Sequence, residues 1–247
     1  VDITSEQFYD LIEKTEGLPV TSQPSPGAFA ELYRELAKTD PDILSIHVSS
    51  GLSGTIQSAK LAVEMVPEAR VTVWDSQTLS APLGWQVEAA AKAVQAGVPL
   101  PQILEKLDRI RKSTEGMFTL DSLKYLIHGG RISHMRGLVA SLLQIRPIIA
   151  VDKVTCKYYT VSQERTFKRA IQKLAEMLER FYPKGTVLRV QLLDAKNPTA
   201  LEQLRQAVES LYKCEWEPTL TIAPILGAHV GPTMIGLCVG PADLFKA

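Results

Sequence analysis

The sequence predicts an α/β fold with two lobes, of which the N-terminal one is built on a parallel sheet with flanking helices. The C-terminal lobe is predicted to be α+β with a mainly antiparallel sheet. Strand and helix patterns alternate through the first half, as they do in parallel sheets covered by helices. In the second half, adjacent strands precede helices, and 247 residues are enough for two cores. We place the boundary between residues 113 and 114.

In the first half, short apolar runs predict buried strands, and segments with helical periodicity predict helices. A helix begins near Ser5, because Thr4 or Ser5 can cap it and Glu6 is acidic in its first turn. The prolines of residues 19–29 exclude a regular ladder there, so that segment is predicted to be a stiff loop. The predicted order is helix 5–11, helix 28–38, strand 42–48, helix 58–66, strand 70–76, helix 84–96 and helix 100–112.

The second half begins with a strand and a helix that is ended by Gly129 and Gly130. Two neighbouring strands after it predict a hairpin. Apolar residues from Phe167 to Phe181 then follow one face of a long helix. The predicted order is strand 116–120, helix 122–130, hairpin strands 146–151 and 157–161, helix 167–181, strand 186–193 and helix 201–211.

Residues 221–241 contain no Lys, Arg, Asp or Glu, which raises the question of a membrane span. The segment also contains four glycines, three prolines and His229. A spanning helix would leave backbone groups unpaired at those breaks. We therefore predict no membrane insertion here, but two buried strands around a loop.

Composition excludes several classes of partner. Lys plus Arg and Asp plus Glu number 27 each, so no net charge attracts nucleic acid or an acidic membrane face. The cysteines are Cys156, Cys214 and Cys238, which are far apart, odd in number and without a C-x-x-C pair. This pattern favours neither a disulfide framework nor a zinc site, and a reducing cytoplasm fits it best.

The stretch Ile46–Lys60, IHVSSGLSGTIQSAK, reads as a strand, a polar turn and a helix start. It lacks the Lys of a P-loop, the spacing of a dinucleotide fingerprint and the last Gly of a nucleophile elbow. What remains is a set of hydroxyls beside free N–H groups at a helix N-terminus. Such a set can bind one negative charge, or it can simply cap the helix. The residues alone favour neither reading.

Further polar residues stand out singly. His229 lies between glycines in an apolar region, where a buried imidazole needs a partner or a ligand. Arg131 follows two glycines and can bind an anion or serve as a cation at a helix C-terminus. Asp75 has no second carboxylate at a suitable spacing, and no nucleophile–base pair or metal-ligand pattern is apparent. No cofactor is therefore predicted.

Six stretches, in order, resemble the DegV family: TSQPSPGAF, HVSSGLSGTIQSA, VWDS, LIHGGRIS, LLQIRPII and GAHVGP. Together they span nearly the whole chain. The resemblance implies a two-lobed α/β fold that binds one long-chain fatty acid between its lobes. It also implies a role as the fatty-acid-binding subunit of a bacterial fatty acid kinase, whose separate ATP-binding subunit phosphorylates the carboxylate. The chain itself would then not be an enzyme.

The resemblance assigns roles to individual residues. Thr21, with Ser22 beside it in the TSQP loop, and Ser50, with the N–H of Gly51, would hydrogen-bond the fatty acid carboxylate. His229 would meet the carboxylate from the second lobe. Residues 1–113 would thus carry the carboxylate-binding loops, and residues 114–247 would form the acyl-chain pocket.

Two arginines are assigned to the surface. Arg131 would lie near the pocket mouth and serve the kinase contact or the phosphate, and Arg165 would lie on the partner-binding surface. The chain departs from the family pattern at Thr233, where Gly is frequent, and at residues 146–155, which lack an Asp-Gly turn. These departures bear on the chain length that the pocket accepts. The resemblance also leads us to expect a leading strand with an Asp-Ser-Thr-type loop, absent from this sequence.

Two alternatives remain open at this point. One is a lipid carrier or sensor without a kinase partner, with or without transient contact to a membrane surface. The other is a stand-alone phosphotransferase or hydrolase using Asp75 and Ser50, which would need a nucleotide or metal site that the sequence does not reveal. A fatty acid needs only a small polar clamp on an apolar tunnel, and the sequence contains residues suited to both.

Overall fold

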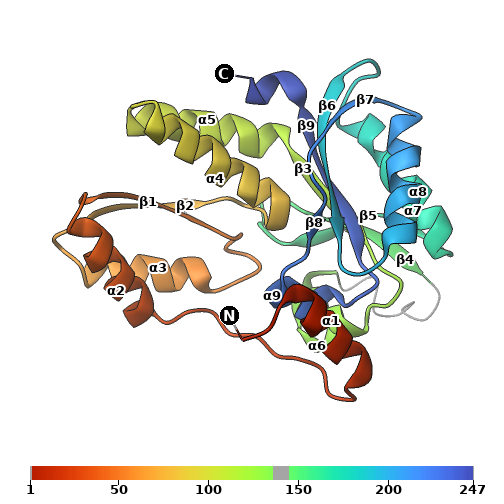
Figure 1. Ribbon diagram of the computed structural model, residues 1–247, viewed down its shortest axis with the longest axis horizontal. Coiled ribbons are helices and arrows are strands. Elements are labelled where there is room, and N and C mark those ends of the chain that lie inside the picture. The colour runs from red at the N-terminus through yellow and green to blue at the C-terminus, as the bar shows by residue number, and fades with distance from the viewer. Residues whose placement is uncertain (1, 136–144, 247) are drawn as a thin grey trace.

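The computed structural model describes residues 2–135 and 145–246, which form the two predicted lobes (Figure 1). In the first lobe two parallel strands lie between two pairs of helices (Figure 1). The strands are β1 (Asp42–His47) and β2 (Arg70–Asp75). The helices are α2 (Pro26–Ala37) and α3 (Thr55–Glu64) on one face, and α4 (Ser80–Gln95) and α5 (Leu100–Ser113) on the other.

Alternation along β1 explains the two layers of the first lobe. Ile43 packs on the side of α2 and α3, whereas Leu44 and Ile46 pack on the side of α4 and α5. Successive side chains of a strand point to opposite faces. Apolar residues on each face therefore bury the two strands on both sides. The predicted parallel sheet with flanking helices is confirmed for these residues.

The second lobe contains one larger sheet, in the order β5-β4-β3-β9-β6-β7, with β8 also paired to β6. All pairs from β5 to β6 are antiparallel, and β7 and β8 are parallel to β6. The strands are β3 (Glu115–Thr119), β4 (Arg146–Val151), β5 (Tyr158–Glu164), β6 (Val187–Asp194), β7 (Lys213–Trp216), β8 (Leu220–Thr221) and β9 (Ile235–Pro241). The predicted hairpin, β4 with β5, and the mainly antiparallel sheet are thus confirmed.

Helices cover this sheet differently on its two faces. On one face, α7 (Phe167–Glu176) and α8 (Pro198–Glu209) pack on a core that includes Leu174 and Leu204, both fully buried. The opposite face packs on a second core that contains residues of α1 (Ser5–Lys14), α6 (Lys124–His128), α9 (Pro224–Val230) and the start of α4. Short 3₁₀ turns are found at Arg131–His134, Met177–Arg180 and Ala242–Phe245.

Two predicted elements were wrong in part. Residues 221–241 contain one long strand, β9, but the first predicted strand is the helix α9, preceded by the two residues of β8. Pro224 stands at the first turn of α9, where its fixed φ and missing N–H suit a helix start. The predicted helix 167–181 ends as an α-helix at Glu176 and continues as a 3₁₀ turn to Arg180.

Helix α1 packs on the second lobe, although the predicted division assigned it to the first. Tyr9 donates its hydroxyl hydrogen bond to the carbonyl of Ile222 at 3.0 Å, and Lys196 pairs with Asp10 and Glu13. The chain then returns to the first lobe through residues 15–25, here called the crossing segment (Figure 1). The division at residue 113 stays a prediction, and α1 is a feature that it does not anticipate.

Helix α4 fixes the two lobes to each other. Trp85 donates its indole N–H to Gln191 of β6 at 2.9 Å. The guanidinium of Arg189 lies 4.6 Å from the ring centroids of both Trp85 and Phe245, and it pairs with Glu88 of α4. Cation–π contacts and a partly buried ion pair thus hold α4 against the second sheet.

A second contact between the lobes involves the loop after β1. The buried hydroxyl of Ser49 donates to the carbonyl of Cys156, in the turn between β4 and β5, at 2.7 Å. A Cβ atom on Gly51 would lie 2.2 Å from that same carbonyl oxygen. Gly51 is therefore required for the close approach of the two lobes, whatever else its N–H does.

We predict that Gly51→Ala destabilises the protein by about 1–3 kcal/mol, because the added methyl forces the loop away from the Cys156 carbonyl. Gly84→Ala is the matched control, since nothing lies within 4 Å of its added Cβ. In a helix interior that change should stabilise by about 0.5–1 kcal/mol. Denaturant unfolding of both variants without ligand measures the difference, and a Gly51→Ala protein as stable as the parent would contradict the close approach.

Candidate functional site

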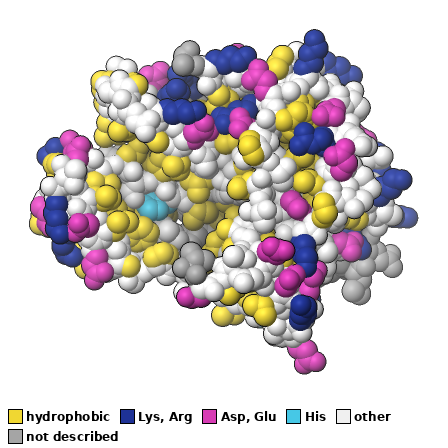
Figure 2. All heavy atoms as spheres, in the orientation of Figure 1, with side chains coloured by type: hydrophobic (Ala, Val, Ile, Leu, Met, Phe, Trp, Pro, Cys, Tyr) yellow, Lys and Arg dark blue, Asp and Glu magenta, His cyan; other side chains and the backbone are white. Residues whose placement is uncertain are grey.

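A cavity of about 680 Å³ lies between the lobes. Its walls come from the crossing segment, the loop after β1, the start of α4, α9, Arg131 and β5. Most of the lining is apolar, and Figure 2 shows hydrophobic side chains gathered on the face between the lobes. The lining residues are Thr21, Ser22, Gln23, Pro24, Val48, Leu52, Ser53, Thr55, Leu79, Ser80, Leu83, Gly84, Val87, Arg131, Tyr158, Ile225, Leu226 and His229.

A hydrogen bond between the crossing segment and α9 closes one side of this cavity. Thr21 Oγ1 lies 2.8 Å from His229 Nε2. The other ring nitrogen, Nδ1, is buried and has no partner among the described residues. A buried N–H without an acceptor is costly, so we assign the imidazole proton to Nε2. The imidazole then donates to Thr21 Oγ1, and the Thr21 O–H is left free to donate to another acceptor.

His229 is half-buried, and its environment favours the neutral ring. Burial lowers the pKa of His229 below its ordinary value, and the positive charges of Arg131 and His128 lower it further. The ring packs against the backbone of Gly129, where a Cβ atom would lie 2.1 Å from Nδ1. The lack of a side chain at Gly129 therefore makes room for the His229 ring, and the surroundings of the ring favour its neutral form.

Arg131 stands between this cavity and a second, more polar hollow of about 380 Å³. Its Nη1 donates to the carbonyl of Gly129 at 2.7 Å, and its Nε approaches the carbonyl of Leu52 at 3.4 Å. Within the described residues it forms no ion pair. The guanidinium is thus held by carbonyl groups and keeps its charge available to an anion.

The second hollow is formed by two glycine-containing loops. It is lined by Ser50, Gly51, Leu52, Ser53, Gly54, Gly129, Gly130 and Arg131. Leu52, Ser53 and Arg131 line both spaces, so the hollow adjoins the polar side of the main cavity. The small glycines leave backbone groups accessible here, which suits a polar or anionic group.

The structure brings most of the predicted site residues together. Thr21, Ser22, Arg131 and His229 line the main cavity, and His229 does so from the last turn of α9 rather than from a loop. Ser50 and Gly51 line the adjoining hollow instead. The N–H of Ser50 approaches the Asp75 carboxylate at 3.3 Å, which also accepts from the N–H of Gln77. Asp75 therefore orders these turns.

Sequence reasoning did not single out Ser53 as a ligand contact, although it lines both spaces. Its hydroxyl lies 2.8 Å from that of Thr55, so the two form a pair at the start of α3. The signal was present, because both residues belong to the hydroxyl-rich turn after β1. Nothing in one sequence tells which of several neighbouring serines faces a cavity.

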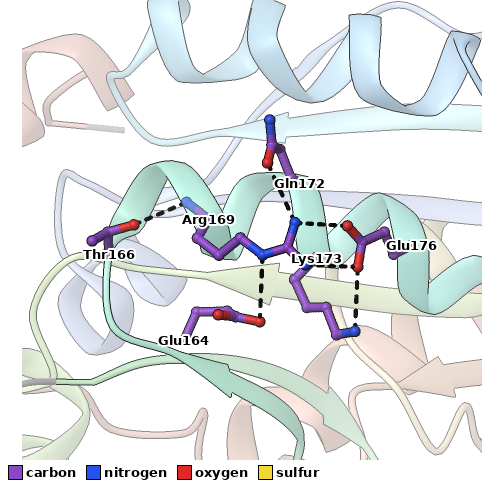
Figure 3. A network of polar contacts seen from close by, with 6 residues as sticks. All are labelled: Glu164, Thr166, Arg169, Gln172, Lys173 and Glu176. Carbon is purple, nitrogen blue, oxygen red and sulfur yellow. Dashed lines mark hydrogen bonds and ion pairs between the residues drawn. The ribbon is translucent and has the colours of Figure 1, made fainter.

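Arg165 lies apart from both spaces, exposed in the connection between β5 and α7. Next to it is a network in which Arg169 pairs with Glu176 at 2.8 Å and with Glu164 at 3.9 Å (Figure 3). Lys173 also pairs with Glu176, at 3.2 Å. Arg169 and Lys173 are thus paired with carboxylates, whereas Arg165 forms no ion pair with a described residue.

Residues 2–135 and 145–246 contain neither a metal-ligand cluster nor a helix suited to span a membrane. No group of three or more His, Cys, Asp or Glu side chains there is arranged to hold a metal ion. In the same part of the chain, no helix combines the length and the apolar character needed to cross a bilayer.

The chain matches one family along almost its whole length. The model of the family described as "Uncharacterised protein, DegV family" matches residues 1–242. A DegV domain-containing protein of Staphylococcus aureus is 36% identical over 239 residues, which are 97% of this chain and 84% of that protein. Protein DegV of Bacillus subtilis is 30% identical over 240 residues, covering 96% of this chain and 84% of the relative.

Solved structures of similar proteins have the same two-lobed fold. DegV of Bacillus subtilis, described as a fatty acid binding protein, superposes with a TM-score of 0.84 at 30% identity, covering 95% of this chain and 83% of that one. A DegV family protein of Thermus thermophilus, described by its fatty acid binding, has a TM-score of 0.86 at 29% identity. That match covers 97% of this chain and 85% of the other.

We predict that acidification below about pH 6.5 destabilises the protein partly through His229. Its pKa is lower in the folded state than in the unfolded chain, so the unfolded chain binds more protons in that range. The stabilisation is present above pH 6.5 and is lost as the pH falls towards the folded pKa. His47 contributes in the same direction, because burial lowers its pKa as well.

Denaturant unfolding between pH 7 and pH 5 measures this loss, and NMR of the imidazole protons assigns it. His229→Gln should lose less stability on acidification than the parent. His128→Gln, at an exposed position, should reduce the loss only slightly, because burial, the largest cause of the lowered His229 pKa, remains. A His229 titration midpoint at or above 6.5 would rule out the neutral, buried ring.

Proposed function

The chain belongs to the DegV family, and we propose that it binds a long-chain fatty acid between its two lobes and presents the carboxylate to a separate kinase subunit. One observation carries the proposal: a largely apolar cavity between the lobes that adjoins a polar hollow at Leu52, Ser53 and Arg131. The DegV proteins of known structure that are described as fatty acid binding support the ligand class.

The size and lining of the cavity suit an acyl chain. Burying about sixteen methylenes at about 0.8 kcal/mol each contributes on the order of 10 kcal/mol before the costs of binding. Leu79, Leu83, Val87, Ile225 and Leu226 supply apolar walls from both lobes. A ligand of this kind needs few polar contacts, and these serve to fix its orientation.

The carboxylate would sit among neutral donors and one cation. The free O–H of Thr21, oriented by His229, donates to one oxygen, and Ser22 lies beside it on the crossing segment. Arg131 supplies the positive charge. Ser50 and the N–H of Gly51 would bind the carboxylate from the adjoining hollow. The polar hollow then leaves the carboxylate open to a second protein.

The phosphorylation would be the work of an ATP-binding partner subunit. No side chain of a described residue is hydrogen-bonded to the Ser50 hydroxyl, and the nearby Asp75 carboxylate accepts hydrogen bonds from two backbone N–H groups. These residues therefore bind and orient. Arg165 would contact the partner, and Arg131 would meet the incoming phosphate. The free thiols of Cys156, Cys214 and Cys238 agree with a cytoplasmic location for such a subunit.

Solvent extraction of the purified protein followed by mass spectrometry tests the ligand class. Long-chain fatty acids should be recovered, and delipidated protein should bind them in titration. Recovery of none, together with no binding in titration, would defeat the proposal. Thermal stabilisation of this chain alone by ATP and Mg²⁺ would instead favour a stand-alone phosphotransferase.

We predict that Thr21→Val weakens fatty acid binding roughly 10- to 100-fold, because it removes a hydrogen bond to a charged group and keeps the side-chain shape. His229→Ala should also weaken binding, because the Thr21 hydroxyl loses the partner that orients it. Cys214 lies outside both cavities, so Cys214→Ala is the control. Equal, small effects of all three changes on affinity would mean that Thr21 and His229 serve packing alone.

We predict that Arg165→Glu slows association with the ATP-binding subunit of a bacterial fatty acid kinase by about tenfold at low salt, because it reverses a charge at the docking surface. Fatty acid affinity should not change, as Arg165 lies outside both cavities. Arg109→Glu, at an exposed position of α5, is the matched charge reversal elsewhere. Surface plasmon resonance at several salt concentrations gives the rates, and equal rates for both variants would remove Arg165 from the interface.

A further inference from the structure

The cavity proposed for the acyl chain, here called the acyl tunnel, contains two hydroxyl groups that would find no hydrogen-bond partner on an unsubstituted fatty acid. A small apolar cavity of about 30 Å³ continues from the main cavity towards the core of the second lobe. Leu79, Ser80, Tyr158 and Leu226 line both, so they stand at the junction. Two of these four residues carry a hydroxyl, although the rest of the small cavity is almost entirely apolar.

Tyr158 is buried, with 5% of its surface exposed, and its hydroxyl forms no hydrogen bond to a described residue. Its ring packs edge-to-face on Phe118 at a centroid distance of 5.5 Å, which holds it in place. Burial raises the pKa of Tyr158 above its ordinary value, so the phenol stays protonated. The hydroxyl of a buried tyrosine normally has a partner, and Tyr158 lines both cavities.

Ser80 carries a second sign of a functional role. Its Oγ is buried and lacks a partner among the described residues. Its backbone adopts φ +54° at the first residue of α4, a left-handed conformation that disfavours residues other than glycine. Strain of this kind persists where the surrounding structure imposes it, often at ligand sites.

We propose that Ser80 and Tyr158 form a second polar station within the acyl tunnel, and that the preferred ligand is a fatty acid with a hydroxyl group on its chain. The inference rests on the proposed function, because it specifies the substrate class of the same cavity. A chain hydroxyl at the junction would give Ser80 and Tyr158 a hydrogen-bond partner that neither has among the described residues. An unsubstituted chain would bury both hydroxyls against methylenes, which costs binding free energy. The site should therefore discriminate strongly between a hydroxylated and an unsubstituted fatty acid.

Titration of delipidated protein with stearic acid and with hydroxystearic acids, substituted at successive carbons, tests the proposal. One regioisomer should bind about tenfold more tightly than stearic acid, since only one position brings its oxygen to the junction. Tyr158→Phe and Ser80→Ala should each reduce that preference and leave the affinity for stearic acid unchanged or higher. Tyr159→Phe, on the neighbouring residue that packs on the other core, should keep the full preference.

Ser80→Gly separates the hydroxyl from the backbone strain. Like Ser80→Ala, it removes the hydroxyl, so it should show the same reduced preference for the hydroxystearic acid. Glycine adopts φ +54° without strain, so the Ser80→Gly protein should unfold at a higher temperature than the Ser80→Ala protein. The proposal is overturned if no regioisomer binds more tightly than stearic acid. It is also overturned if Tyr158→Phe weakens both ligands equally, since Tyr158 would then hold the carboxylate. Failure of every fatty acid to bind would defeat the proposed function itself.

Discussion

The hydrogen bond between Thr21 and His229 joins the crossing segment to the second lobe beside the cavity, and several features of the chain place its two partners. Thr21 reaches His229 because α1 packs on the second lobe and the crossing segment returns from it to the first. His229 is placed by α9, whose Gly227 allows the Tyr9 ring to approach closely. Gly129 in turn makes room for the imidazole. The bond is thus a product of tertiary packing.

The loop after β1 illustrates how one short stretch serves both stability and binding. Its first serine, Ser49, is buried and donates to the carbonyl of Cys156 across the lobe interface. Gly51 is constrained by the same carbonyl, while Ser53 faces the cavity. The capping role that the sequence left open is not found at α3, because Gly54 is its N-cap residue and no side chain caps it. Some hydroxyls order the turn, and others remain available to a ligand.

Sequence periodicity was sufficient for most of the fold, because strands such as β1 and helices such as α8 carry their burial pattern locally. It failed at α9, where Pro224, Gly227 and Gly231 read as breaks. In the structure these residues start the helix, admit Tyr9 and lie against the Tyr125 ring, respectively. Partners more than a hundred residues away decide that outcome, and a local pattern does not contain them. The packing of α1 on the second lobe was missed for the same reason.

The site was predictable as a set of residue types, but its polarity was not. A resemblance can name Thr21, Arg131 and His229, but it does not show that the imidazole is neutral and serves to orient a hydroxyl. The neutral arrangement has a physical advantage in an apolar cavity. A buried charge without a counterion is costly, whereas the neutral histidine–threonine pair keeps its mutual hydrogen bond when the ligand is gone. The one cation, Arg131, is held by carbonyl groups beside the polar hollow, where solvent or an anion can reach it. A protein that binds and releases a ligand needs both properties, because its empty state must remain folded.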